Sequence, residues 1–368
     1  MKQIKKHFVA LMIFIACSAI LFGFYVKYTK DSSKSIFDKR DVVYFGATSP
    51  STYYKGQIEN YEAEGLADKT TTEQLYVLYD KLIEQYPYQI EKLDLGVCSD
   101  NAHHLYEYDI IPQTYAWVDE KVKITSPTVL IICGQHGYEK ASTFGLYYFI
   151  RDLLENSEKN DALGWIKANT TIKIIPVCNP YGFDRSEYLN ANGVNLNRNY
   201  DTEGFSAEVE LGSDQYGGKE PFDQPETQIV KGFIQNNKDA VLFIDFHTYG
   251  FDAVESAWYI NWNELLDVDD EYYKRANYAI TSHINRQTVE FQRQFGLYVG
   301  NLCVGYQTLG DPKFPSADSY AVSQGIVGLT VEGFTGFPGG DLYTGNVLQG
   351  NAQIIGNAIL NLLCELMK

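Results

Sequence analysis

Hydrophobic residues occur in two kinds of pattern along this chain, and segments of the two kinds alternate. Short apolar runs rich in Val, Ile and Leu are typical of buried strands, and apolar residues at helical spacing are typical of helices. Strands are therefore predicted over 92–97, 104–110, 128–133, 171–177, 241–246 and 326–331. Helices are predicted over 72–86, 141–155, 225–235, 270–293 and 346–367. Strands that alternate with helices indicate an α/β fold, with a mixed, largely parallel central sheet flanked by helices.

The first 30 residues have a different pattern. An unbroken apolar stretch runs from Phe8 to Val26. As a helix it would span roughly 28 Å, which is close to the hydrocarbon thickness of a bilayer. Lys2, Lys5 and Lys6 precede the stretch and favour a cytoplasmic N-terminus. We therefore expect residues 1–30 to form a single-pass transmembrane anchor in the cell membrane, with the rest of the chain extracytoplasmic.

A cleaved signal peptide, which would give a secreted protein, stays open as an alternative. Such signals usually have a shorter apolar core and a cleavage site of small residues. The stretch contains no clear Ala-x-Ala sequence. Ala16-Cys17 loosely resembles a lipoprotein cleavage site, but Phe14 matches poorly and the apolar run continues past Cys17.

The chain beyond the anchor is strongly acidic. Residues 31–70 are polar and irregular, so we expect a stalk or lead-in there and a folded domain over 71–368. Five of the 30 basic residues and none of the 47 acidic residues precede residue 31, so the remainder is more acidic than the net charge of −17. This charge repels nucleic acid, and we expect no nucleic-acid partner. The six cysteines include no Cys-x-x-Cys pair, which argues against a thiolate zinc site.

Candidate metal ligands follow two of the predicted strands. His136 and Glu139 come shortly after the strand 128–133, and His247 comes directly after the strand 241–246. Side chains placed just past strand ends can converge although they are distant in sequence. Two imidazoles and one carboxylate are a known ligand set for a catalytic zinc that keeps its fourth position open. A lone His-x-x-Glu is common, so ordinary polar residues at strand ends remain the alternative.

Several motifs occur together with these residues in a defined order. They are His-Gly-Tyr-Glu at 136–139, Asn-Pro-Tyr-Gly-Phe at 179–183, Asn-Gly-Val-Asn-Leu-Asn-Arg-Asn-Tyr at 192–200, Pro-Glu-Thr at 225–227, Phe-His-Thr-Tyr at 246–249 and Glu332. Over about residues 70–367 this set resembles the zinc carboxypeptidase family of metallopeptidases, of the carboxypeptidase A type. The resemblance implies a zinc carboxypeptidase-like catalytic domain over 71–368. It also implies a substrate, namely a peptide with a free C-terminal carboxylate whose last bond is hydrolysed.

The resemblance assigns a role to each candidate residue of the metal centre. His136, Glu139 and His247 match the ligands of one Zn²⁺ ion. Glu332 matches the general base, which takes a proton from the zinc-bound water that acts as nucleophile and passes it to the leaving amine. A glutamate at a strand end is often only a solvated cap, and this is the alternative for Glu332.

Further residues match the family's groups for binding substrate and stabilising the oxyanion. Asn197 and Arg198 match the pair that grips the substrate's terminal carboxylate, although Arg198 could instead form a surface salt bridge. Arg185 is the candidate for the catalytic arginine that stabilises the oxyanion. Related sequences often place that arginine three positions nearer to the Asn-Arg pair, where this chain has Tyr188.

Side-chain specificity is predicted from one acidic residue. Asp318 lies near the family position that lines the floor of the side-chain pocket, where an acid would favour a terminal Lys, Arg or diamino acid. An exposed loop aspartate is the alternative. Tyr306 and Tyr320 are candidates for the tyrosine that closes over the substrate in many members, and an ordinary surface or core aromatic is the alternative for both.

Three other functions remain open from the sequence. A zinc amidase acting on bacterial cell-wall peptides would use the same catalytic residues with diamino-acid specificity. A catalytically inactive module could keep the fold and capture peptide C-termini. A deacylase of acyl-amino acids has a similar metal triad, but the Asn-Arg-Asn segment and the late glutamate argue against it.

Overall fold

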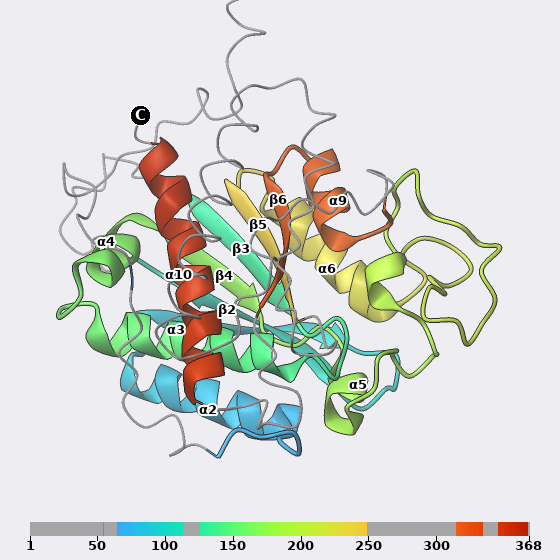
Figure 1. Ribbon diagram of the computed structural model, residues 1–368, viewed down its shortest axis with the longest axis horizontal. Helices are drawn as coiled ribbons and strands as arrows, with labels where there is room; N and C mark the ends of the chain where they lie inside the picture. Colours follow the sequence, from blue (N-terminus) through green and yellow to red (C-terminus); the bar gives the residue numbers. More distant parts are fainter. Residues whose placement is uncertain (1–53, 55–64, 113–125, 249–313, 334–344, 367–368) are drawn as a thin grey trace, which may run out of the picture. The chain divides into compact units, whose positions relative to one another are not determined.

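The structure of the protein is a computed structural model that describes residues 54, 65–112, 126–248, 314–333 and 345–366 (Figure 1). The chain divides into two compact units, Met1–Asp41 and Val42–Lys368, and every described residue belongs to the second unit. The predicted anchor, most of the predicted stalk and the predicted helix over 270–293 lie outside the described residues. Among the helices that are described, none combines the length and hydropathy needed to cross a bilayer.

A six-stranded mixed sheet forms the centre of the second unit, in the order β1-β2-β4-β3-β5-β6. The strands β3, β4, β5 and β6 run parallel to one another, and β2 is antiparallel to both β1 and β4. This confirms the predicted mixed, largely parallel sheet. The strand bounds are β1 Ile90–Val97, β2 His104–Ile110, β3 Thr128–Cys133, β4 Thr171–Ile175, β5 Leu242–His247 and β6 Gly328–Glu332.

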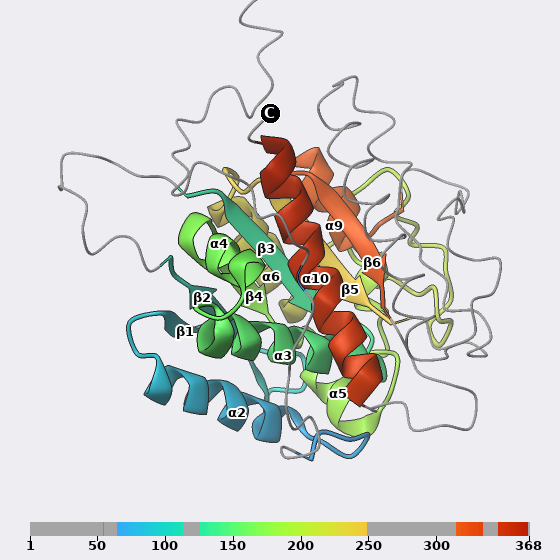
Figure 2. The same cartoon turned by 60° about the vertical axis from the view of Figure 1, so that its left-hand side comes forward.

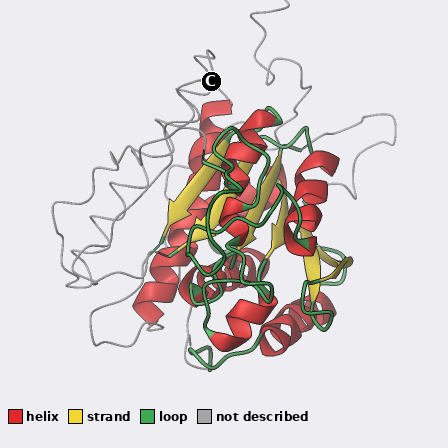
Figure 3. Ribbon diagram, turned by 90° about the vertical axis from the view of Figure 1, so that its right-hand side faces the viewer, coloured by secondary structure: helices red, strands yellow, loops and turns green. Residues whose placement is uncertain are grey.

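Helices cover both faces of this sheet (Figures 2 and 3). On one face α3 packs along α10, and Tyr79 of α2 contacts Tyr147 of α3. On the other face α6 and α9 pack on the strands. The bounds are α2 Thr72–Gln85, α3 Lys140–Asn156, α4 Asp161–Asn169, α5 Pro180–Arg185, α6 Pro225–Asn236, α9 Ala317–Ser323 and α10 Gly345–Leu366.

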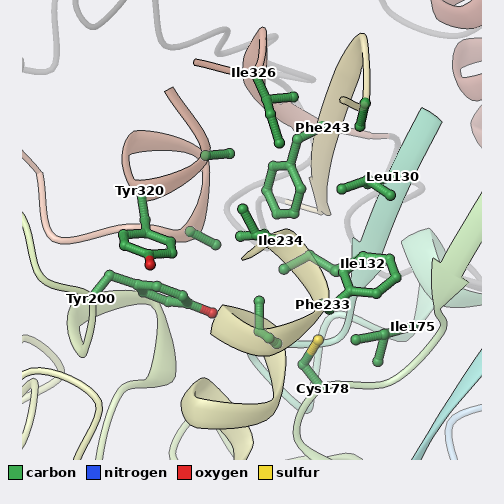
Figure 4. Packing of buried hydrophobic residues seen from close by; sticks show 14 of the residues in the cluster. Leu130, Ile132, Ile175, Cys178, Tyr200, Phe233, Ile234, Phe243, Tyr320 and Ile326 are labelled. Atoms are coloured by element: carbon green, nitrogen blue, oxygen red, sulfur yellow. The ribbon is translucent and has the colours of Figure 1, made fainter. Parts of the chain in front are cut away.

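The central strands read as continuous apolar runs because both of their faces are covered. All six residues of β5 are buried, and in β3 only Thr128 is not fully buried. Leu130, Ile132 and Phe243 point from the strands to one side, where they meet side chains of α6 and α9 (Figure 4). This packing holds the carboxyl ends of the parallel strands in place.

Three short helices were not predicted from the sequence. These are α4, α5 and α9, and each is nine residues or fewer. In segments this short, few turns are available to display a helical period, so tertiary contacts decide the conformation. The helix over 72–86 was predicted well because it begins with a clear signal, a capping box between Thr71 and Gln74.

Tyr54, from the predicted stalk or lead-in, is built into the core of the folded unit. Its side chain is 1% exposed, and its ring contacts Phe149 of α3 at a centroid distance of 5.9 Å. Its hydroxyl donates to Asp152 Oδ2 over 2.8 Å, and its backbone exchanges two hydrogen bonds with the side chain of Asn357 in α10. This part of the lead-in therefore contributes to the packing of α3 against α10.

We expect Tyr54→Ala to lower the free energy of unfolding by about 3–5 kcal/mol, because it deletes a large buried aromatic group between two helices. Urea unfolding of the purified protein measures the change. Tyr88→Ala is the matched control, since Tyr88 is 93% exposed and should change the stability little. Equal effects of the two substitutions would contradict the packing role of Tyr54.

Candidate metal centre

The carboxyl ends of three neighbouring strands, β3, β5 and β6, form one edge of the sheet (Figure 2). His247 is the last residue of β5 and Glu332 is the last residue of β6, and the two are paired in register. The segment with His136 and Glu139 leaves β3 directly on the other side of β5. Parallel strands end at a common edge, so residues far apart in sequence meet there.

The turn after β3 requires glycine for a steric reason. A Cβ atom at Gly137 would lie 1.9 Å from the carbonyl carbon of Gly182, so the turn packs directly against the backbone of α5. Asn179 supports both segments: its Oδ1 accepts from Gly182 N over 2.9 Å, and its Nδ2 donates to the carbonyl of Gln135 over 3.3 Å. The Asn-Pro-x-Gly motif therefore holds the backbone that presents His136.

The three predicted ligands form one buried cluster. His136, Glu139 and His247 are 7%, 6% and 2% exposed, and their ligand atoms all lie within 4.8 Å of one another. Glu139 Oε1 lies 2.8 Å from His136 Nδ1, and Glu139 Oε2 lies 2.7 Å from His247 Nδ1. Polar groups that are so thoroughly buried need compensation, and a cation held between them supplies it.

The other nitrogen of each histidine is held by a second group. His136 Nε2 lies 3.2 Å from Asn195 Oδ1, and His247 Nε2 lies 2.9 Å from Asp245 Oδ1. Metal-binding histidines commonly have such outer partners, which orient the ring and select the tautomer. The Nδ1 atoms are therefore the ligand atoms. Together with Glu139 they fit a single zinc ion with an open coordination position.

The charge state of the cluster also suits a cation. Burial raises the pKa of Glu139, but the charges and hydrogen bonds of the two histidines outweigh it and lower the value to about 2. Burial lowers the pKa of His136, which favours the neutral ring that binds a metal. Asp245 and Glu139 outweigh burial and raise the pKa of His247, so a metal would displace a proton from that ring. Glu139 therefore supplies a full negative charge at neutral pH.

Glu332 lies beside the cluster at the end of β6. Glu332 is half-buried, and its Oε2 is shielded from solvent with no hydrogen-bond partner among the described residues. Burial and the nearby charge of Glu139 raise the pKa of Glu332 to about 8. A carboxyl group with such surroundings is suited to proton transfer near neutral pH, and a solvated cap would show neither feature.

Asn197 and Arg198 lie next to the cluster on a short 3-10 helix, Leu196–Arg198. Asn197 Nδ2 is 3.3 Å from His247 Nε2, and Asn197 Oδ1 accepts from the backbone of Ala317. Arg198 donates to Gln215 Oε1 and to the carbonyl of Asn197, each over 2.7 Å. Its guanidinium stacks on the ring of Phe314 at 4.1 Å. Arg198 and Phe314 line a pocket together with parts of the 204–217 loop. Among the described residues, Arg198 forms no salt bridge.

The other predicted site residues lie in different environments, either at the surface or in the interior. Arg185 is exposed at the end of α5, where its guanidinium stacks on Tyr181 at 3.9 Å and donates to the Tyr181 carbonyl. Asp318 is fully buried in α9, so the alternative of an exposed loop residue is wrong. Tyr320 is a core residue whose hydroxyl accepts from Gln235, which excludes a mobile tyrosine at this position. Tyr306 lies outside the described residues.

Two residues that orient the histidines were missed from the sequence. Asp245 is an acid inside an otherwise apolar strand, two residues before His247, and this unusual placement was an available signal. Asn195 is one of four asparagines in the 192–200 segment, and nothing in the sequence distinguishes it from its neighbours. Only the contact with His136 does so.

Comparison with known proteins finds similarity to carboxypeptidases. Residues 75–325 match the family described as zinc carboxypeptidase. Carboxypeptidase O of Homo sapiens is 24% identical over 194 residues, which are 48% of this chain and 50% of that protein. Metallocarboxypeptidase A of Trichophyton rubrum is 28% identical over 169 residues, which are 41% of this chain and 40% of that protein. In these alignments the chain spans about half the length of the curated relatives it matches, or less.

The fold has counterparts among solved structures. Bovine thrombin-activatable fibrinolysis inhibitor, in complex with tick carboxypeptidase inhibitor, superposes with a TM-score of 0.61 at 18% identity. The superposition covers 84% of this chain and 99% of that chain. At this level of identity the likeness concerns the arrangement of sheet and helices.

Proposed function

Because the chain belongs to the zinc carboxypeptidase family, we propose that it is a zinc-dependent metallocarboxypeptidase that removes the last residue of a peptide. The observation that carries the proposal is the buried cluster of His136, Glu139 and His247 with Glu332 beside it. The cluster pairs a metal centre with an adjacent carboxyl group that is free to move a proton. An inactive module for peptide binding would need no such carboxyl group.

Each residue has a role in this reaction. When bound, zinc polarises the scissile carbonyl and lowers the pKa of its water to roughly 7. Glu332 accepts a proton from the attacking water and delivers it to the leaving amine. Asn197 and Arg198 hold the substrate's terminal carboxylate, for which the fork of the guanidinium is suited. Asn195 and Asp245 act through the histidines that they orient.

A substrate profile tests the proposal. Peptides blocked at the amino end should lose one C-terminal residue, and the same peptides with an amidated C-terminus should resist, because the amide cannot pair with Arg198. A chelator should stop the reaction and added zinc should restore it. Metal analysis of the purified protein should give one zinc per chain. A zinc-loaded protein that cleaves neither blocked peptides nor cell-wall peptides would overturn the proposal.

The surroundings of Asp318 favour a basic terminal residue as substrate. Its Oδ1 accepts from Ser316 Oγ over 2.5 Å, the side chain of Thr330 also stabilises the carboxylate, and its buried Oδ2 forms no hydrogen bond of regular geometry within the described ranges. Burial raises the pKa of this carboxyl group. A buried carboxylate oxygen without a regular hydrogen bond suits an ammonium or guanidinium group from a substrate. The same preference would suit the alternative function, a zinc amidase that cleaves next to a diamino acid of cell-wall peptides.

We expect Asp318→Asn to lower kcat/KM for peptides ending in Lys or Arg by about 10²-fold or more, because it removes one partner of a buried charge pair. Peptides ending in Leu should be affected far less and serve as the internal control. Cell-wall peptides ending in a diamino acid, assayed in parallel, separate the two candidate functions. An unchanged ratio between Lys and Leu substrates would show that Asp318 does not select the side chain.

We also propose that residues 1–30 anchor the chain in the cell membrane and that the catalytic domain lies on the extracytoplasmic side. The support is the apolar run from Phe8 to Val26 with lysines before it. The chain should sediment with membranes and be cut by protease added to intact cells or spheroplasts. An intact N-terminus in the soluble fraction would contradict anchoring, and a shortened chain in the medium would favour the secreted alternative.

A further inference from the structure

The side chain of Tyr188 packs on the metal centre. Its ring stacks on His136 with a centroid distance of 4.0 Å and an interplanar angle of 20°. The ring of Tyr138 stacks against Tyr188 at 5.6 Å. Tyr188 lies three residues after the end of α5 and shortly before Asn195, so these two segments of the backbone determine its position.

The hydrogen bonds of Asn195 make the Tyr188 hydroxyl an acceptor among the described residues. Asn195 Nδ2 donates to the carbonyl of Asp214 over 2.6 Å and to Tyr188 Oη over 3.2 Å. The Asp214 carbonyl can only accept, so it determines the orientation of the amide. Tyr188 Oη therefore acts as an acceptor in this bond and retains its own O–H as a donor. Within the part of the chain that is described, no acceptor takes this hydrogen.

The hydroxyl lies near residues that we propose bind the metal and the substrate. It interacts electrostatically with Arg198, Glu139 and His247. A phenol has an ordinary pKa of about 10, so the hydroxyl is protonated and neutral at physiological pH. A peptide that reaches from Arg198 to the metal ligands brings its last carbonyl group past this hydroxyl. Arg185, which was predicted for this role, is instead exposed on α5 and stacked on Tyr181.

We propose that the Tyr188 O–H donates a hydrogen bond to the scissile carbonyl oxygen as negative charge develops on it. The inference rests on the proposed function and makes Tyr188 a catalytic residue in the role predicted for Arg185. A preorganised donor of this kind stabilises the transition state more than the ground state. The bond forms and breaks without any proton transfer, so the phenol ends the reaction unchanged.

Tyr188→Phe tests the proposal because it removes the hydroxyl and keeps the ring on His136. We expect kcat to fall by about 10²-fold, which is typical for the loss of one oxyanion donor, with little change in KM. Affinity for a peptide phosphonate, whose oxygens imitate the tetrahedral state, should fall in parallel. Zinc affinity, measured by competition with a chelator, and the melting temperature should stay at the wild-type values.

Two further variants decide between the possible donors. Tyr181→Phe is the matched control, since it removes a phenolic hydroxyl from a ring on α5 that contacts Arg185. Arg185→Gln tests the competing donor. The inference is overturned if Tyr188→Phe keeps wild-type kcat and phosphonate affinity, if its loss follows weaker zinc binding, or if Arg185→Gln alone produces the loss.

The measurements also separate this inference from the proposed function. Turnover of blocked peptides by the wild-type protein reports on the proposed function alone. The ratio of phosphonate affinities between wild type and Tyr188→Phe reports on the hydroxyl. A wild-type protein that is active on peptides, together with an unchanged ratio, would leave the proposed function standing and refute the role of Tyr188.

Discussion

Glu332→Gln should lower kcat by about 10³-fold or more while the protein keeps one zinc ion per chain. Glutamine has nearly the same shape as glutamate but cannot accept a proton from the attacking water. The position at the end of β6, paired with His247, leaves the metal ligands untouched by the change. Steady-state hydrolysis of a blocked peptide measures the loss, and metal analysis measures the zinc.

Glu187→Gln is the matched control for this result. Glu187 is exposed, so the same chemical change there removes one negative charge without altering the metal centre. Its kcat should equal that of the wild type. If Glu332→Gln kept more than about a tenth of the activity, well outside the usual effect of losing a general base, another group would have to move the proton.

Glu139→Gln should weaken zinc binding on the order of 10³-fold, beyond the roughly 10- to 100-fold effect of an outer partner. Glu139 is the one acidic member of the cluster, and each of its oxygens faces a histidine Nδ1. Removing its charge leaves a buried cation with less compensation, and a neutral amide is a poor ligand for zinc. Competition with a chromophoric chelator measures the dissociation constant.

Asp245→Asn should weaken zinc binding less than Glu139→Gln does, and it serves as the comparison. Asp245 contacts His247 Nε2 at 2.9 Å and does not face the metal position, so its loss should weaken zinc binding by only about 10- to 100-fold. Equal zinc affinities for Glu139→Gln and the wild type would remove Glu139 from the ligand set. Glu332→Gln should therefore lose activity and keep zinc, whereas Glu139→Gln should lose both activity and zinc.

The candidate site shows why some predictions from the sequence succeed. His136 and His247 follow short, continuous apolar runs, and parallel strands bring their carboxyl ends to one edge of the sheet. The histidines are therefore brought together by the topology alone. Glu332 follows the same rule, because its strand is the next neighbour of β5.

Other residues could not be placed from the sequence. Asp318 was predicted to line the side-chain pocket, with an exposed loop as the alternative, and a short helix buries it completely. Tyr320 was a candidate for a mobile tyrosine, and its packing against Tyr200 and Phe222 makes it part of the core. A helix of seven residues has too few positions to reveal its buried face, and neighbours from distant segments decide it.

The amino-acid sequence by itself determined the order of the long strands and helices, the class of the fold and the types of ligand at the strand ends. These follow from local hydrophobic periods and from short motifs, which each segment carries within itself. Only the tertiary structure decided that Nδ1 of each histidine faces Glu139, that Asn195 and Asp245 hold the opposite nitrogens, and that Tyr188 lies on the metal centre while Arg185 is exposed. Such contacts join segments distant in sequence, and they exist only once the packing of sheet and helices has set the distances between them.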